Sequence, residues 1–270
     1  YMEIPQKNDD NALEMYTLQC RNHILKPLAD KYGIDTSDQA IRAAVEQHNE
    51  VCRLIRAIGD FRKEANPRVT GYEFHILTMV SYVAPKHLIV DKLRETLEEI
   101  KTREPDAADK YRARVVFVGS EVDDVDVIRL VEESGAYVCA DRFCYGSLPG
   151  RDEILLNDDE DVVKQVCRQV QGRAQCPRYW DMAKMTGRRD YVADLAKEYG
   201  ADGIIYEQMK FCDPWAYERM IGTIVLRDEH GYPVLAVDRP YSIGSSGQMR
   251  TRVQAFVESI EIKKIQGGKK

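Results

Sequence analysis

Val115-Val116-Phe117-Val118-Gly119-Ser120 is an apolar run that ends at two small residues. A short apolar run bounded by turn residues is typical of a strand that is buried on both faces of a parallel sheet. A helical pattern then starts at Asp123 and ends at Gly135, and a second apolar run occupies residues 137–140. A strand, a helix and a second strand therefore follow one another, as at the start of an α/β domain.

The same alternation continues towards the C-terminus. Helical patterns cover residues 162–170 and 191–199, apolar runs at 203–206 and 233–238 predict two more strands, and a closing helix covers residues 248–260. Alternating buried strands and helices favour a parallel sheet covered on both faces. The sequence therefore predicts an α/β fold in which a helical region is followed by a Rossmann-like domain with a four-stranded parallel sheet.

The part of the chain before this domain has a mostly helical pattern. One apolar stripe belongs to a segment that starts near Ser37, a second covers residues 74–80, and a third follows Pro85. We therefore expect a mostly helical region at residues 1–108 and the Rossmann-like domain at residues 109–270.

Composition disfavours several classes of function. The 270 residues are 44% hydrophobic and 31% charged, as in ordinary soluble proteins. The net charge of −6 argues against nucleic acid as a partner, and no apolar stretch approaches the roughly 20 residues that a membrane span requires. No signal peptide is visible, so the cytoplasm is the expected compartment. Residues 1–5 resemble the end of a strand and lack an initial methionine, so we expect a domain upstream of this chain.

The motifs of several common enzyme classes are absent from the sequence. There is no GxSxG elbow, no Walker-type loop and no HExxH pair, so we expect neither ATP hydrolysis by this chain nor zinc-hydrolase activity. Gly119-Ser120-Glu121 lacks the later glycines of a dinucleotide fingerprint, which disfavours nicotinamide binding.

Seven cysteines are the most distinctive chemical feature of the chain. They form no CxxC pair, so any metal site must be assembled by the fold. Cys144 follows the second predicted strand and Cys212 follows the third, which places both at the carboxyl edge of the sheet. Cys176 lies in a loop between helices that could reach either edge of the sheet. The other four lie within predicted helices or a strand and are interpreted as packing residues: Cys20, Cys52, Cys139 and Cys167.

Cys212 is the strongest single candidate for chemistry. Asp213 is a good N-cap and Pro214 suits the first helical position, so the thiol lies at the start of a helix. A helix N-terminus stabilises anions and therefore favours a thiolate. This pattern makes Cys212 a candidate metal ligand, redox thiol or nucleophile, and the alternative is a buried structural cysteine.

A second candidate site is the Gly-Ser loop at residues 244–247. Its backbone amides precede a helical pattern that starts at Gln248, a favourable position for phosphate or carboxylate. Ser245, Gly247 and Gln248 are therefore candidate substrate-binding residues, and the alternative is a flexible turn.

Three segments of the chain resemble the 2-hydroxyacyl-CoA dehydratase and benzoyl-CoA reductase subunit family. They are Lys210-Phe211-Cys212-Asp213-Pro214, the preceding Gly200-Ala201-Asp202-Gly203-Ile204-Ile205, and residues 247–258. Residues 1–7 and 49–56 also fit the pattern of that family, so the resemblance covers nearly the whole chain.

The resemblance implies an oxygen-sensitive iron–sulfur subunit of an anaerobe, with a [4Fe–4S] or double-cubane cluster. It implies three partners, namely a homologous catalytic subunit in a homo- or heterodimer, an ATP-hydrolysing iron–sulfur activator that delivers low-potential electrons, and an acyl-CoA substrate. Cys212 matches a cluster ligand of the family, and Cys144 and Cys176 match cysteines that look like ligands in its double-cubane members. The family's upstream domain carries further ligands, so this chain alone is expected to be inactive, and no catalytic acid or base is assigned.

Three readings of the function follow. The aromatic-rich residues 206–215 and the additional cysteines favour the benzoyl-CoA reductase or double-cubane branch. The alternative is a subunit of an (R)-2-hydroxyacyl-CoA dehydratase, which removes water by a radical route. The reading from a different class is a non-catalytic scaffold or electron-relay subunit that holds a cluster for its partner.

Overall fold

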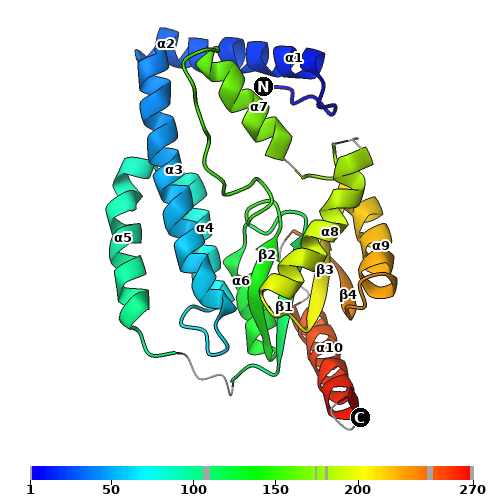
Figure 1. Cartoon of the computed structure of the whole chain (residues 1–270). Helices are drawn as coiled ribbons and strands as arrows, with labels where there is room; N and C mark the ends of the chain where they lie inside the picture. The colour runs from blue at the N-terminus through cyan, green and yellow to red at the C-terminus, as the bar shows by residue number, and fades with distance from the viewer. Residues whose placement is uncertain (1, 106–109, 174, 180–181, 242–245, 268–270) are drawn as a thin grey trace.

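A four-stranded parallel sheet forms the centre of the protein in the computed structural model, which describes residues 2–105, 110–173, 175–179, 182–241 and 246–267 (Figure 1). The strand order is β2-β1-β3-β4, and every neighbouring pair is parallel. The strands are β1 (Ala113–Gly119), β2 (Ala136–Arg142), β3 (Gly203–Met209) and β4 (Val234–Arg239). Each coincides with an apolar run that was expected to be a strand, so the predicted fold class is confirmed.

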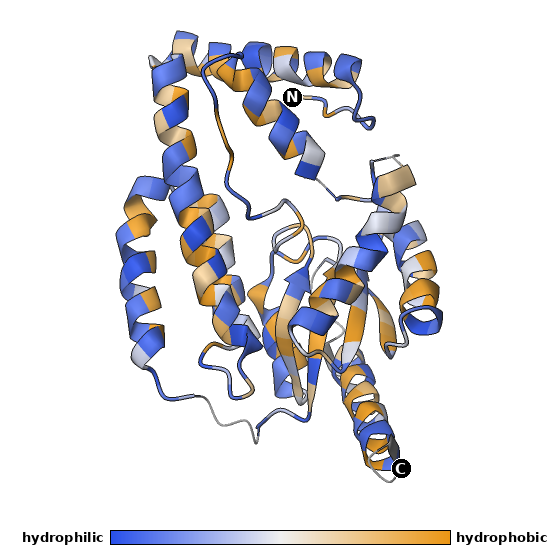
Figure 2. Ribbon diagram, in the orientation of Figure 1, coloured by the Kyte–Doolittle hydropathy of each residue, from blue (hydrophilic) through white to orange (hydrophobic). Residues whose placement is uncertain are grey.

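Helices cover both faces of this sheet. On one face, α6 (Val125–Glu133) and α10 (Ser246–Gly267) pack against strand residues that include Phe117 and Ile205. On the other face, α8 (Met182–Glu198) and α9 (Asp213–Asp228) pack against residues that include Val116 and Ile204. Figure 2 shows the apolar residues concentrated on the strands between these helices. Because successive side chains of a strand point to opposite faces, a strand covered on both faces is apolar at nearly every position.

A layer of three helices lies beside the β2 edge of the sheet (Figure 1). α3 (Asp38–Asp60) ends in a 3-10 turn (Phe61–Lys63) and is followed by α4 (Gly71–Val83) and α5 (Lys86–Thr102). The Ser37 hydroxyl accepts a hydrogen bond from the Ala40 amide at the start of α3, and Thr70 and Glu73 form a capping box at the start of α4. The three helices expected in this part of the chain are therefore confirmed.

Residues 10–32 are helical, in keeping with the mostly helical region expected at residues 1–108 and with the helix expected around Cys20. The elements are α1 (Asp10–Cys20), a π-helical turn η1 (Arg21–Leu25) and α2 (Lys26–Tyr32), and α7 (Val162–Arg173) packs against α1. The strand expected at residues 1–5 is wrong, because residues 2–5 have no regular secondary structure. Met2 and Ile4 instead pack against the core that α1 and α7 share.

The helical region and the Rossmann-like region are closely connected. α7 lies beyond residue 109, but it shares its core with α1, as Leu13 and Val163 illustrate. On α3, the Asn49 side chain donates to the Ile154 carbonyl at 2.9 Å and accepts from the Ile154 amide at 2.7 Å. The division into residues 1–108 and 109–270 stays a prediction. Within the described ranges, no helix combines the length and the apolar character that crossing a membrane needs.

Glu132 at the end of α6 attaches α4 to the sheet. Its carboxylate accepts hydrogen bonds from the Gly71 amide at 2.8 Å, the Tyr72 amide at 3.1 Å and the Val138 amide at 3.2 Å. Two of these donors belong to the first turn of α4, where backbone amides have no partner within the helix. Gly71 permits this approach, because a Cβ atom there would lie 2.7 Å from the Val138 carbonyl oxygen.

Replacing Glu132 with alanine should therefore destabilise the protein. The Glu132→Ala variant leaves three backbone amides without their acceptor, which we expect to lower the free energy of unfolding by about 2–4 kcal/mol. Denaturant unfolding of the variant and the parent protein measures this difference. The matched control is Glu133→Ala, because Glu133 is exposed and pairs only with Arg250 among the described residues. Equal stability of the two variants would contradict this role of Glu132.

Candidate functional site

The connections of β1 and β3 diverge at their carboxyl ends. The chain leaves β1 towards α6 on one face of the sheet and leaves β3 towards α9 on the other face. Open parallel sheets bind ligands at such a point, where neighbouring connections separate. Gly119 of β1 lies opposite Glu207 of β3 in the strand register. The candidate site is therefore built around this pair.

Glu207 is fully buried, with 0% of its surface exposed. It accepts hydrogen bonds from the Ser120 amide at 3.1 Å and the Ser120 hydroxyl at 2.8 Å, and its other oxygen lies 2.9 Å from Nε of Arg239. Burial raises the pKa of Glu207 to about 7, although Arg239 and Ser120 act in the opposite direction. These contacts join the ends of β1, β3 and β4, and the Ser120 hydroxyl also accepts from the Met209 amide at 2.6 Å.

The structure places the three candidate cysteines around one apolar cluster. Cys144 follows β2, and its amide donates to the Ser120 carbonyl at 3.0 Å. Cys212 precedes α9, and Cys176 lies before α8. All three pack against the cluster that contains Trp215. The indole nitrogen of Trp215 is buried and has no nitrogen or oxygen partner among the described residues.

Electrostatic interactions show that these thiols are neighbours. Burial raises the pKa of Cys144 to about 12, with negative charge on Cys176 and Cys212 adding to this shift and a hydrogen bond with the Trp215 side chain opposing it. Burial likewise raises the pKa of Cys212, and its hydrogen bond with the Trp215 amide only partly offsets this effect. Desolvation therefore outweighs the stabilisation of a Cys212 thiolate that was expected from the helix N-terminus, and the expectation of a favoured thiolate is wrong.

Two further details of the Cys212 segment differ from expectation. Cys212 itself is the N-cap of α9, and Asp213 is the first helical residue. The preceding Phe211 has φ 72° and is 95% exposed, an uncommon combination for a large aromatic residue. Tyr206 and Trp215 are buried in the core, so these two aromatic residues of segment 206–215 serve in packing.

The remaining cysteines lie away from this edge. Cys52 and Cys139 are buried, and Cys139 donates to the Val115 carbonyl. Cys20 of α1 and Cys167 of α7 lie 3.5 Å apart between their sulfur atoms. This contact between distant segments was not expected from the sequence, and both residues fill the junction of α1 with α7.

The described residues include only part of the Gly-Ser loop. Ser245 lies outside the described residues. Gly247 and Gln248 belong to the first turn of α10, and both are exposed. A Cβ atom at Gly247 would meet nothing within 4 Å. The assignment of this loop as a substrate-binding site stays a prediction.

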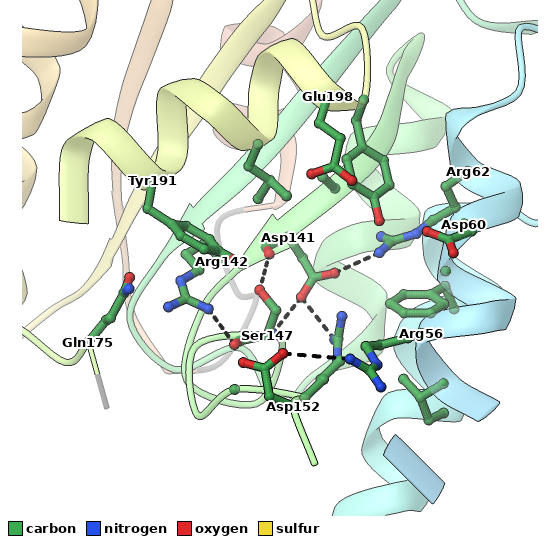
Figure 3. Close-up of a pocket in the computed structure, with 18 of the residues that line it drawn as sticks. Arg56, Asp60, Arg62, Asp141, Arg142, Ser147, Asp152, Gln175, Tyr191 and Glu198 are labelled. Carbon is green, nitrogen blue, oxygen red and sulfur yellow. Dashed lines mark hydrogen bonds and ion pairs between the residues drawn. The ribbon is translucent and has the colours of Figure 1, made fainter. Parts of the chain in front are cut away.

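A cavity of about 560 Å³ lies between α3, the end of β2, the loop after β2 and α8 (Figure 3). Asp141 forms its floor and is 5% exposed. It pairs with Arg62 at 3.0 Å and Arg151 at 3.1 Å, and it accepts a hydrogen bond from the Ser147 amide at 2.7 Å. Burial alone would raise the pKa of Asp141, but the two arginines hold it well below its usual range.

Sequence reasoning missed the polar groups around this cavity and around Glu207. The sequence does contain a signal for these groups, because charged residues stand at or near the ends of the apolar runs that form the strands. Asp141 and Arg142 end β2, Glu207 interrupts β3, and Arg239 ends β4. A charged residue in a strand buried on both faces needs a partner, so such positions mark buried polar networks.

His75 of α4 lies next to this network and is buried. Its ring packs edge-on against Phe143, with the ring centroids 5.1 Å apart. Burial lowers the pKa of His75 to about 4, with Asp141 opposing this shift and Arg151 and Arg62 adding to it. The neutral imidazole is therefore the form that the folded protein favours.

The stability of the protein should consequently fall in mild acid. In the unfolded chain His75 takes up a proton near its ordinary pKa of 6.5, whereas the folded protein resists protonation down to about pH 4. The stability that His75 contributes is complete above pH 6.5 and is lost between pH 6.5 and 4, by up to roughly 3 kcal/mol. Unfolding of the His75→Phe variant across this range should show a shallower loss. His87→Phe, at an exposed histidine, is the control and should keep the slope of the parent protein.

The family model described as 2-hydroxyglutaryl-CoA dehydratase, D-component, matches residues 1–260. The chain belongs to this family. The match covers nearly all of the 270 residues, so the resemblance inferred from the segments around Cys212 is confirmed.

Curated relatives include subunits of dehydratases and of a reductase. The chain is 25% identical over 230 residues to the (R)-phenyllactyl-CoA dehydratase beta subunit of Clostridium sporogenes, covering 84% of this chain and 59% of that relative. It is 24% identical over 265 residues to the beta subunit of (R)-2-hydroxyglutaryl-CoA dehydratase from Acidaminococcus fermentans. This match covers 96% of this chain and 68% of that relative. It is 23% identical over 268 residues to a benzoyl-CoA reductase subunit of Thauera aromatica. This match covers 97% of this chain and 67% of that relative. The matches therefore span between 59% and 68% of the length of these relatives.

Proposed function

We propose that this chain is part of a cytoplasmic enzyme subunit that holds an iron–sulfur cluster and delivers single electrons to an acyl-CoA thioester. One observation carries the proposal. Cys144, Cys176 and Cys212 come from three separate segments of a member of this family and gather around one apolar cluster at the carboxyl edge of the sheet.

The three thiols have the chemistry that such a cluster requires. Thiolates are the usual protein ligands of iron–sulfur clusters, and they bind separate iron atoms. Within the described ranges, no three His, Cys, Asp or Glu side chains converge closely enough to hold a single metal ion. Because the candidate ligands do not converge on one point, a site for a single metal ion is disfavoured. Ligands that bind different iron atoms of a polynuclear cluster can lie farther apart. When bound, a cluster supplies low-potential electrons and, at an iron without a protein ligand, a Lewis-acidic position for a carbonyl oxygen.

The surrounding residues suit this role. The apolar cluster of Val118, Tyr206 and Trp215 covers one side of the thiols and leaves them half-buried, and partial burial of this kind tunes the potential of a bound cluster. The Trp215 indole N–H has no oxygen or nitrogen partner among the described residues and is available to donate to sulfur. The thiols must lose their protons to bind iron, so binding of the cluster releases protons.

The proposal includes three partners. The sequence has no Walker-type loop, so the energy for low-potential reduction comes from a separate ATP-hydrolysing iron–sulfur activator. A homologous subunit pairs with this chain, in keeping with relatives that are named as subunits. The substrate is a CoA thioester, the class named in those relatives.

Two reactions are candidates. The benzoyl-CoA reductase type follows from the additional cysteines, of which Cys144 and Cys176 lie at the site. Loss of water from a 2-hydroxyacyl-CoA is the second candidate, because several relatives are named as dehydratases. Identities of 25%, 24% and 23% to the two dehydratase subunits and the reductase subunit are too similar to favour either branch.

Substitution of Cys212 tests the ligand assignment. In the complete subunit, produced anaerobically with its partner, Cys212→Ala should lower the iron content and change the electron paramagnetic resonance signal of the reduced cluster. Cys144→Ala and Cys176→Ala should also lower the iron content and change the signal of the reduced cluster. Cys52→Ala is the matched control, because Cys52 is a buried cysteine on α3 away from the sheet edge. An unchanged iron content and signal in Cys212→Ala would reject the assignment.

Turnover assays then distinguish the reactions. With reduced activator and ATP, the complex should convert either benzoyl-CoA or a 2-hydroxyacyl-CoA at a rate that Cys212→Ala reduces by at least 100-fold, about 2.7 kcal/mol in activation free energy. A cluster that is reduced by the activator without turnover of either thioester would instead support the electron-relay reading.

A further inference from the structure

The cavity beside β2 carries an excess of positive charge. Its described lining contains six cationic side chains and four carboxylates, in a chain whose net charge is −6. The cationic side chains are those of Arg56, Arg62, Lys63, Arg142, Arg151 and Arg173. A concave positive site in a negatively charged protein concentrates anions locally.

Two cations of the lining, Lys63 and Arg56, are paired with carboxylates. Lys63 lies 2.8 Å from Asp60 and 2.5 Å from Glu198. Arg56 lies 3.6 Å from Asp152 and also pairs with Glu153. These charges offset one another and do not account for the excess.

The excess lies in the buried interior. Asp141 is a single carboxylate shared by two buried or nearly buried arginines, Arg62 and Arg151. Arg142, the next residue along the chain, adds a third guanidinium to this group. Figure 3 shows Arg142 on the cavity wall between Tyr191 and Ser147, with Gln175 on the same side.

Arg142 has no counter-charge of its own. It is 4% exposed, and within the described ranges no carboxylate lies at ion-pair distance from it. Its guanidinium donates to the Ser147 carbonyl and stacks on the Tyr191 ring, 4.2 Å from the ring centroid. Among the described residues, neither its Nε nor the side-chain oxygen of Gln175 on the same wall has a partner. Burying an uncompensated guanidinium is costly, and arginine forms its strongest hydrogen bonds with carboxylate or phosphate oxygens.

We propose that this cavity binds a carboxylate or phosphate group of a ligand, with Arg142 as the principal binding residue. Tyr191 holds the guanidinium plane by stacking, and Ser147 fixes one of its N–H groups, so the remaining donors are oriented before the ligand arrives. The site is separate from the three cysteines and does not depend on the presence of a cluster.

Calorimetric titration tests the site and identifies the source of the anion. Three probes are titrated separately at low ionic strength: inorganic phosphate, adenosine 3′,5′-bisphosphate and glutarate. The bisphosphate represents the nucleotide end of a CoA thioester, and glutarate represents a carboxylate on an acyl group. We expect at least one probe to bind, and Arg142→Gln to weaken that probe's binding at least tenfold. Preference for the bisphosphate assigns the site to a nucleotide phosphate, and preference for glutarate assigns it to a carboxylate.

Two controls keep this test decisive. Arg227→Gln, at an exposed arginine of α9 paired with the adjacent Asp228, should leave the affinity unchanged. Because Arg142→Gln can also alter folding, the parent protein is treated with phenylglyoxal, and the bound probe should slow modification of Arg142 as measured by peptide mass spectrometry. The proposal is overturned if none of the probes binds the parent protein, if Arg142→Gln binds them as tightly, or if a bound probe leaves modification of Arg142 unchanged. The titration measures binding without turnover or cluster reduction. The anion site can therefore be confirmed even if the proposed electron transfer is rejected, and electron transfer can be confirmed even if the anion site is rejected.

Discussion

The buried carboxylate of Asp141 is the interaction on which the arrangement of this protein depends most. It ends β2 and is neutralised by Arg62, which follows α3, and by Arg151 of the loop after β2. Removing one partner of a buried ion pair typically costs about 3–5 kcal/mol, because the other charge is left in a medium that solvates it poorly. The helical layer, the sheet edge and the loop are therefore joined at one point.

The position of Cys144 follows from this arrangement. The loop that carries it is held at one end by Ser147, whose amide donates to Asp141, and at the other by the Ser120 carbonyl, which accepts from the Cys144 amide. Ser120 in turn belongs to the network around Glu207. Two buried carboxylates thus position the loops at the carboxyl edge of the sheet, and the thiols there are oriented by backbone contacts rather than by each other.

The sequence predicts the sheet well because each strand is a short apolar run between turn residues, as residues 115–118 show. It predicts α3 and α4 because their caps and apolar stripes are local features. It places Cys20 in a helix, but it does not predict that the apolar residues of α1 find their partner in α7 much later in the chain. The cavity is missed for the same reason, since Arg62, Arg142 and Tyr191 meet only in the folded protein. The proximity of the candidate cysteines was inferred from topology, whereas the effect of burial on their pKa required the structure.

The contact between Cys20 and Cys167 also bears on how the chain folds. These residues are separated by 147 positions, and their helices supply much of each other's core. Contacts at such separation form late, because the entropy of closing the intervening loop must be lost first. During synthesis α1 leaves the ribosome well before α7, so its apolar residues lack this partner until α7 has emerged. The docking of α1 on α7 is therefore a late step of folding, and until it is complete the apolar residues of both helices are open to aggregation.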